Sequence, residues 1–509
     1  MIVLITPPFT QLNTPYPATA YIKGFLNTRQ LPSLQLDLGL EVILTLFSRT
    51  GLERLFRQLE EKYEDLTEGQ KALVDMQDTY IRRIDPVIRF LQYADPTLAY
   101  ALAAGDYLPQ GPRFQQLEEL DWAFGQVGIQ DKARHFATLF LEDLSDLITQ
   151  TVDPYFGFSR YAERLSRSAS SFEGLLEALQ LPPTFTDQLL FERLALREET
   201  LRGASLVCLS VPFPGNLYSA LRIGQYLKKL YPAVKVAMGG GYPNTELRRL
   251  SDPRVFDFLD YVTLDDGERP LLQVYGHACG QVESTQLKRT FIRDQSGEVQ
   301  FINSEEQPDF PFTAVGTPDY SGLPLSSYLG VIAWTNPMHR MWSDGRWNKL
   351  TMAHGCYWKK CSFCDISLPY IQDYSPLSAS LLVDRMEELI QATGTTGFHF
   401  VDEAAPPALM RELALEILRR GLICTWWTNI RFESRFSYDL CRLLKASGCV
   451  AVSGGLEVAS DRLLEKMQKG VTVLRWRGWR AILPLQELWC MPTSCMDFLR
   501  RQHRKRWIV

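Results

Sequence analysis

Residues 350–370 read LTMAHGCYWKKCSFCDISLPY and place three cysteines, Cys356, Cys361 and Cys364, within nine positions. The chain has only ten cysteines in 509 residues, so three thiols with the spacing C-x4-C-x2-C point to a shared ligand. A structural zinc site uses four protein ligands. The triplet therefore predicts a metal group that leaves one coordination position open.

Two metal groups are compatible with three thiolates. In a [4Fe–4S] cluster, three thiolates can hold three irons while the fourth iron stays free to bind a substrate or cofactor. A zinc ion would need a fourth ligand, which His354 or Asp365 could supply. Both metals stay open at this point, and free buried cysteines are the third interpretation.

The segment that contains the triplet has the pattern of a β/α protein. Apolar runs typical of strands alternate with amphipathic runs typical of helices. The predicted strands cover 350–354, 397–403, 423–429 and 449–457, and the predicted helices cover 378–393, 407–420 and 434–447. Four βα units make half or more of a β/α barrel, whose chemistry lies at the carboxyl ends of the strands. We therefore predict a partial barrel over 349–473, with the cysteines at its functional end.

The first part of the chain, residues 1–284, predicts a separate α/β domain. Strand patterns at Ile2–Thr6, Leu206–Ser210 and before Gly239 alternate with helical patterns, which indicates a parallel sheet. Residues 50–200 have apolar residues at i, i+3 and i+4 and predict a mainly helical insertion. Residues 285–348, which contain several prolines and aromatic residues, are interpreted as a linker.

Ligands of open parallel sheets bind beyond the carboxyl ends of the strands. The residues predicted to contact a ligand there are Ser210, Gly239, Gly240, Gly241, Asp266, Gly267 and Glu268. Glycines let a backbone approach a large ligand closely. Glycine-rich strand ends are also common in sheets of this kind. The three glycines therefore mark either a ligand site or an ordinary feature of the fold, and both interpretations stay open.

Composition narrows the class of protein. The chain is 46% hydrophobic and 22% charged, which is typical of a globular protein. No apolar run reaches the roughly 18 residues that a membrane span needs, so we expect no membrane partner. The net charge of −5 argues against nucleic-acid binding. The cysteines show no disulfide framework, which predicts a cytoplasmic location.

The cysteine triplet after a strand, with Phe363 just before the last cysteine, resembles the radical S-adenosylmethionine (SAM) superfamily. The usual spacing in that superfamily is C-x3-C-x2-C, and this chain has one residue more between the first two cysteines. The preceding α/β domain resembles a cobalamin-binding domain. Together, residues 1–473 resemble the radical SAM proteins that carry a B12-binding domain, although the motif D-x-H-x-x-G, which supplies a histidine to cobalt, is missing.

The resemblance implies an activity and a set of cofactors. A [4Fe–4S] cluster on the three cysteines would bind SAM and cleave it reductively to methionine and a 5′-deoxyadenosyl radical. The electron would come from a donor such as flavodoxin or ferredoxin, and the substrate, a small molecule or another compound, stays unknown. Methyl transfer through cobalamin is the leading reaction, and a radical rearrangement is the other.

The resemblance also implies roles for residues at the strand ends. The predicted contacts to SAM are Phe363, Asp402, Glu403, Asn429, Arg431 and Glu457. The residues at the carboxyl ends of the first domain's strands, from Ser210 to Glu268, would then contact cobalamin. Polar residues at strand ends also serve as helix caps or line solvated loops, so that alternative stays open. His399 lies inside a predicted strand and is expected to be packed.

Residues 474–509 differ from the rest of the chain. They carry eight Lys and Arg against two acidic residues, a net +6, so the other 473 residues sum to −11. We therefore expect translation out of frame from about residue 474. A back-translation that is pinned by Trp489, Met491 and Met496, with synonymous codons chosen elsewhere, reads GIMVHAYLMYGFPTQ in another frame, which resembles a fifth barrel strand. Strands five and six would then be absent. The alternatives to an enzyme are a non-catalytic remnant and a zinc-binding interaction module.

Overall fold

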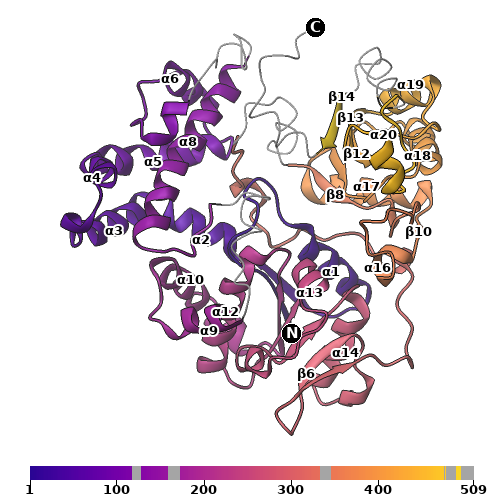
Figure 1. The fold of residues 1–509 in the computed structure, drawn as a ribbon, viewed down its shortest axis with the longest axis horizontal. Coiled ribbons are helices and arrows are strands. Elements are labelled where there is room, and N and C mark those ends of the chain that lie inside the picture. Colours follow the sequence, from indigo (N-terminus) through magenta and orange to yellow (C-terminus); the bar gives the residue numbers. More distant parts are fainter. Residues whose placement is uncertain (117–127, 159–171, 333–345, 475, 477–488, 495–509) are drawn as a thin grey trace. The chain divides into compact units, whose positions relative to one another are not determined.

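The computed structural model describes residues 1–116, 128–158, 172–332, 346–474, 476 and 489–494. The chain divides into two compact units, which Figure 1 shows coloured along the sequence. Unit 1 comprises Met1–Asp309 and Tyr320–Gly345, and unit 2 comprises Phe310–Asp319 and Arg346–Val509. No helix in the described ranges is both long and apolar enough to cross a membrane.

The described part of unit 1 is built on a seven-stranded sheet with the order β2-β1-β3-β4-β5-β6-β7. The strands are β1 (Ile2–Thr6), β2 (Ser33–Asp37), β3 (Leu206–Ser210), β4 (Lys235–Gly239), β5 (Tyr261–Thr263), β6 (Thr290–Arg293) and β7 (Val299–Ile302). The first five strands are parallel, and β6 and β7 are antiparallel. The strand order reverses between β1 and β3, which is the switch point where doubly wound sheets bind ligands. The predicted parallel α/β sheet is confirmed.

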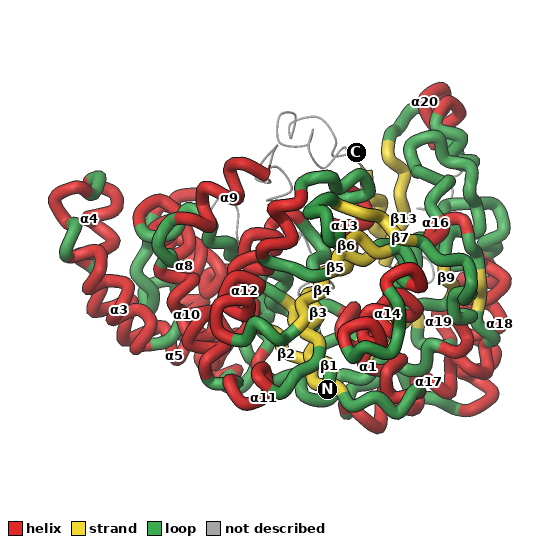
Figure 2. The backbone as a smooth tube through the Cα atoms, turned by 90° about the horizontal axis from the view of Figure 1, so that it is seen from below, coloured by secondary structure: helices red, strands yellow, loops and turns green. Residues whose placement is uncertain are grey.

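Helices cover both faces of this sheet (Figure 2). α1 (Pro17–Thr28) and α14 (Glu268–Ala278) lie on one face, and α12 (Leu217–Leu230) lies on the other. A strand that is covered on both faces must be apolar on both. All five residues of β1, IVLIT, are accordingly buried.

Residues 50–200 are mainly helical where the structure describes them, as predicted. The helices around and within this range are α2 (Leu38–Leu46), α3 (Arg49–Glu60), α4 (Glu68–Asp75), α5 (Gln77–Leu91), α6 (Ala99–Ala104), α8 (Ile129–Thr151), α9 (Phe172–Gln180), α10 (Phe185–Ala195) and α11 (Glu198–Arg202). Their buried apolar residues join the core of the sheet in one cluster. The helical block is therefore part of the same hydrophobic core as the sheet.

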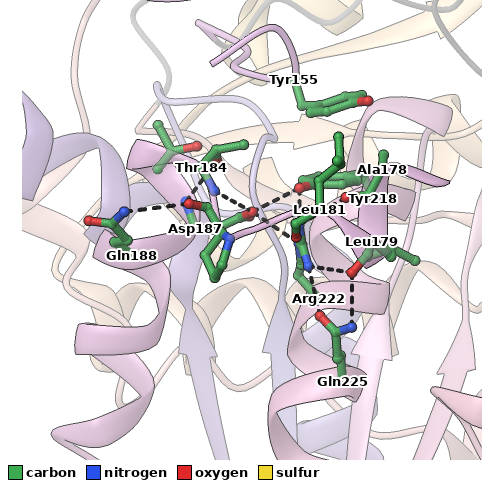
Figure 3. A network of polar contacts seen from close by, with 12 residues as sticks. Tyr155, Ala178, Leu179, Leu181, Thr184, Asp187, Gln188, Tyr218, Arg222 and Gln225 are labelled. Carbon is green, nitrogen blue, oxygen red and sulfur yellow. Dashed lines mark hydrogen bonds and ion pairs between the residues drawn. The ribbon is translucent and has the colours of Figure 1, made fainter. Parts of the chain in front are cut away.

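A buried arginine ties the helical block to α12 (Figure 3). Arg222 donates from Nη1 to the carbonyl of Leu179 at 2.8 Å and from Nη2 to the carbonyl of Ala178 at 3.0 Å. Its Nε lies 3.0 Å from Asp187 Oδ2 and donates to the hydroxyl of Tyr218 at 2.9 Å. The guanidinium thus satisfies carbonyls at the end of α9 and a carboxylate of α10 together.

Replacing Arg222 by Met should lower the free energy of unfolding by roughly 3–5 kcal/mol, because it leaves the Asp187 carboxylate buried without its cation. Arg202→Met is the matched control, since Arg202 and Glu198 form an ion pair with side chains 65% and 54% exposed. The control should cost less than about 1 kcal/mol. Urea unfolding measures both changes, and equal effects would contradict the assigned role of Arg222.

The region interpreted as a linker, 285–348, has more structure than the sequence suggested. β6 pairs with β5 and β7 pairs with β6, so residues 290–302 extend the sheet of unit 1 as an antiparallel hairpin. Tyr328 also belongs to unit 1, where its hydroxyl donates to the buried Asp37 carboxylate at 2.7 Å. The prolines and aromatic residues of this region therefore do not mark one continuous linker.

The described part of unit 2 contains a five-stranded parallel sheet with the order β14-β13-β12-β11-β8. The strands are β8 (Asn348–Leu350), β11 (Gly397–Phe400), β12 (Thr425–Ile430), β13 (Cys449–Glu457) and β14 (Trp489–Ser494), and the helices α17 (Ala379–Thr393), α18 (Pro407–Arg420) and α19 (Tyr438–Ala446) lie along one face (Figure 1). Ser378 and Ser437 cap α17 and α19 through their side chains. Gly394 and Gly421 end α17 and α18 at positive φ. These signals explain why the predicted βα order agrees with the structure.

The predicted strand 350–354 is divided in the structure. β8 ends at Leu350, and β9 (Ala353–His354) pairs antiparallel with β10 (Ser375–Pro376) outside the main sheet. The chain leaves the sheet because the backbone N–H groups of Met352 and Ala353 bind the side chain of Asp402. The sequence pattern did not reveal this break.

β14 lies in the region predicted to lack a strand. It pairs parallel with β13, from Ala451 with Trp489 to Glu457 with Ser494. The expectation that the fifth strand is absent is therefore wrong for residues 489–494. Of residues 474–509, the structure describes 474, 476 and 489–494, and the others lie outside the described residues.

Candidate functional site

The predicted cluster ligands and SAM contacts of unit 2 gather at the carboxyl ends of its parallel strands. The cysteine loop, residues 355–366, follows β9. Asp402 and Glu403 follow β11, Asn429 lies near the end of β12, and Glu457 ends β13. Parallel strands present these ends at one edge of the sheet, so residues that are far apart in sequence share one site.

Asp402 fixes the start of the cysteine loop. Its carboxylate accepts hydrogen bonds from Met352 N at 2.9 Å and Ala353 N at 2.8 Å, and its side chain is buried. Burial raises the pKa of Asp402 to about 7, while the backbone N–H groups favour its ionised form. Asn429 donates to the Asp402 carbonyl at 3.1 Å. In the structure, the predicted SAM contact Asp402 thus positions the backbone of β8 and β9.

The raised pKa of Asp402 predicts a pH-dependent contribution to stability. The folded state holds this proton up to about pH 7, whereas the reference pKa of an aspartate is 3.8. Between these values the folded state binds more protons than the unfolded state, so stability falls as pH rises. Relative to Asp402→Asn, the wild-type chain should therefore lose up to about 4 kcal/mol between pH 4 and pH 7.

Denaturant unfolding of both proteins at several pH values measures this difference. Glu412→Gln, which removes an exposed carboxylate from α18, serves as the control for a change of net charge. If the wild-type chain and Asp402→Asn show parallel pH profiles, the buried carboxyl does not carry the effect.

The cysteine loop enters through a glycine turn. Gly355 has a φ of 70°, and a Cβ at this position would lie 2.7 Å from the carbonyl oxygen of Asp373. Cys356 N donates to the Ile371 carbonyl at 3.1 Å. His354, one of the proposed fourth ligands of zinc, has its Nδ1 2.7 Å from the Asp373 carbonyl. Only glycine fits this turn, which directs the first cysteine away from the strand.

The segment 466–470, which begins at the last residue of α20 (Asp461–Lys466), holds the middle of the cysteine loop. Ser362 N donates to the Met467 carbonyl at 3.0 Å, and Trp358 Nε1 donates to the Gln468 carbonyl at 2.9 Å. Backbone carbonyls of the 466–470 segment thus fix the loop on either side of Cys361. The loop is positioned by contacts that involve no thiol.

Arg431 also contacts the cysteine loop and the 466–470 segment. Its guanidinium lies 3.6 Å from the centroid of the Trp358 ring and donates to the Lys469 carbonyl. Its Nη1 donates to Glu433 at 3.3 Å, and the side chain is 5% exposed. These contacts give Arg431 a positioning role, while its contact with SAM stays a prediction.

Lys469 is a charged residue that the sequence reasoning missed. It is buried, and its Nζ lies 2.8 Å from Glu457 Oε1 and 5.1 Å from the centroid of the Phe363 ring. Burial raises the pKa of the Cys361 and Cys364 thiols, and the ammonium group of Lys469 opposes this effect at both. No local sequence pattern marks this lysine, because its partners lie elsewhere in the chain.

The three thiols differ in exposure. Cys356 and Cys361 are half-buried and Cys364 is exposed, and all three are free cysteines. They are close enough to influence one another electrostatically. In the described residues, no group of three or more His, Cys, Asp or Glu side chains is placed to hold a metal ion. Three free thiols on one fixed loop, with Lys469 and Arg431 nearby, suit the donor set of a [4Fe–4S] cluster, in which each thiolate binds its own iron.

The other predicted SAM contacts lie around this loop. Phe363 is 50% exposed, and Glu403 is exposed and makes no hydrogen bond or ion pair with the described residues. Glu457 has a φ of 61° and holds Lys469. Phe363 and Glu403 thus have exposed surface, whereas Glu457 already has a partner.

A buried pair of basic residues lies deeper in the sheet. Lys349 Nζ is 2.9 Å from His399 Nδ1, and the His399 ring stacks on Trp427 with centroids 3.5 Å apart. Burial lowers the pKa of Lys349 to about 7 and, together with that lysine, lowers the pKa of His399. The expectation that His399 is packed is confirmed. Sequence reasoning missed Lys349, since a lysine in a short strand is usually exposed.

The predicted cobalamin contacts lie at one edge of the unit 1 sheet. Ser210 ends β3, Gly239 ends β4, and Asp266–Glu268 leads into α14. The Ser210 hydroxyl is buried without a hydrogen-bond partner among the described residues, next to the switch point. An unsatisfied buried hydroxyl is costly unless a ligand or water binds it, so this edge fits a polar ligand.

Within the glycine triplet, contacts inside the protein already require a glycine at position 240. Gly240 has a φ of 117°, and a Cβ there would lie 2.7 Å from the carbonyl oxygen of Val211. Tyr242 N donates to the same carbonyl at 3.0 Å. Close approach of β4 to the loop after β3 therefore requires Gly240, whether or not a ligand is bound.

The Asp266–Glu268 loop is held by Arg289. This guanidinium donates to the Asp266 carbonyl at 3.0 Å and binds Asp309 through two hydrogen bonds of 2.6 and 2.8 Å. Gly267 approaches α1 closely, since a Cβ there would lie 3.1 Å from Ile22 Cδ1. The loop is thus fixed against α1 and the chain after β7.

No protein-family model matches the chain. The uncharacterized methyltransferase PH0819 of Pyrococcus horikoshii is 27% identical over 265 residues. The match covers 50% of this chain and 52% of that protein, so the chain spans about half the length of this relative.

Two solved structures have similar folds. The cobalamin-dependent SAM radical enzyme OxsB with aqua-cobalamin bound has a TM-score of 0.47 at 14% identity, covering 59% of this chain and 42% of that one. The radical SAM methyltransferase TsrM of Kitasatospora setae, with cobalamin and a [4Fe–4S] cluster bound, has a TM-score of 0.46 at 17% identity. The match covers 62% of this chain and 66% of that one.

Proposed function

We propose that this chain belongs to a radical SAM enzyme whose [4Fe–4S] cluster is held by Cys356, Cys361 and Cys364. The observation that carries the proposal is the placement of three free thiols on one fixed loop at the carboxyl edge of a parallel sheet. Three thiolates leave one iron open. That open iron is the position where SAM would bind.

The chain's own residues would prepare this site in distinct ways. Asp402 and the 466–470 segment hold the loop in place, and Lys469 and Arg431 supply positive charge beside the thiols. Phe363 is exposed where an adenine ring could pack, and Glu403 offers a carboxylate to an amino group. When bound, the cluster supplies the electron that cleaves SAM, and the protein supplies position and electrostatics.

We further propose that unit 1 binds cobalamin at the edge formed by the loops after β3, β4 and β5. The buried Ser210 hydroxyl and the fixed loops beside it support this placement. No histidine of a D-x-H-x-x-G motif would serve as the lower ligand of cobalt. Methyl transfer is the favoured reaction, in keeping with the Pyrococcus methyltransferase. The proposed location is cytoplasmic, with a flavodoxin or ferredoxin as electron donor and a substrate that is not identified.

Anaerobic reconstitution of the chain with iron and sulfide tests the proposal. The wild-type protein should bind about four irons and four sulfides, as a [4Fe–4S] cluster requires. Cys356→Ala, Cys361→Ala and Cys364→Ala should each lose most of this iron. Cys441→Ala is the matched control, because Cys441 is a buried cysteine of α19 and should retain it.

Metal analysis of the protein as purified distinguishes the alternatives. One zinc per chain that the three cysteine variants lose would replace the radical SAM assignment with a zinc module. A full cluster without 5′-deoxyadenosine formation from SAM would indicate a non-catalytic remnant. Sequencing the gene across codons 474–509 tests separately whether that region is read out of frame.

A further inference from the structure

Lys469 is unusual among the lysines of unit 2 that lie near the cysteine loop, because its charge is buried. Its exposed fraction is 9%, whereas Lys466, three residues earlier at the end of α20, is exposed. The Lys469 ammonium group is fixed between the Glu457 carboxylate at 2.8 Å and the face of the Phe363 ring at 5.1 Å. Its position is therefore defined by two partners from different parts of the chain.

The charges of this pair act on the thiols in opposite directions. Phe363, whose ring faces the Lys469 ammonium group, directly precedes Cys364. The N–H of Ser362, the residue after Cys361, donates to the Met467 carbonyl, so the segment that carries Lys469 lies beside both cysteines. A cation there attracts the negative charge on a thiolate, whereas the Glu457 carboxylate bound to Lys469 repels it. The other charged groups near these thiols are Arg431 and Glu403. Arg431 also supports Trp358, so Lys469 is the cation whose charge can be changed with least effect on the loop.

An iron–sulfur cluster on these thiols would experience the same field. One-electron reduction of the cluster adds a negative charge, which a nearby cation stabilises and a nearby carboxylate destabilises. Because Lys469 is buried, solvent and salt screen its charge less than the charge of an exposed lysine.

We propose that Lys469 and Glu457 form a charge pair that sets the reduction potential of the cluster, with Lys469 raising it and Glu457 lowering it. This inference rests on the proposed function, since it concerns the cluster that the three cysteines would hold. Lys469 would act on the cluster through its charge alone, so it is a positioning residue and not a catalytic one. The electron itself comes from an external one-electron reductant.

The test is an EPR-monitored redox titration of the reconstituted full-length chain with dithionite, without SAM. Lys469→Met should shift the midpoint potential to a more negative value, and Glu457→Gln should shift it to a more positive value. Lys469→Arg, which keeps the charge, should stay closer to the wild-type value than Lys469→Met. The matched control is Lys466→Met, which removes an exposed charge from the same segment and should leave the potential unchanged.

An ion pair with a purely structural role would not shift the midpoint potential in opposite directions in Lys469→Met and Glu457→Gln. If both variants keep their iron and sulfide while neither potential moves, or both move in the same direction, the inference is overturned. If Lys469→Met fails to fold, the shift of Glu457→Gln toward positive potential decides in its place. A wild-type chain that binds no cluster would overturn the proposed function itself, a result that iron analysis distinguishes from the others.

Discussion

The cysteine loop depends on one buried carboxylate. Asp402, two residues after β11, accepts hydrogen bonds from the backbone N–H groups of Met352 and Ala353, so the chain leaves the sheet after β8. Residues 350–353, LTMA, contain no glycine or proline that would end the strand there. Gly355 then turns the chain, and the first cysteine follows at once. The position of all three thiols relative to the strand ends follows from this exit.

The loop is held a second time by backbone carbonyls of the 466–470 segment. Trp358 and Ser362 donate hydrogen bonds to this segment, and the Arg431 guanidinium packs on the Trp358 ring. The same segment carries Lys469, so the contacts that fix the loop also bring a buried cation to it. The structure and the electrostatics of the site are thus coupled through residues 466–470, the last residue of α20 and the four that follow it.

Much of the architecture could be predicted from the sequence, because the signals are local. Ser378, Gly394 and Gly421 mark helix ends within unit 2, and the cysteine spacing marks the metal loop. The contacts that position the site are not local. Trp358 and Gln468 are 110 residues apart, and a buried lysine has no sequence signature. The fifth strand was missed since residues 474–509 lack apolar alternation, and β14 is held by pairing with β13.

The most direct measurement of the central claim is the EPR spectrum of the reduced, reconstituted chain before and after SAM is added. An open iron coordinated by SAM changes the environment of the cluster. We expect a [4Fe–4S] signal whose shape changes when SAM is added and does not change when the same volume of buffer without SAM is added. A cluster signal that is identical with and without SAM would contradict the claim that these three cysteines leave an iron open for that cofactor.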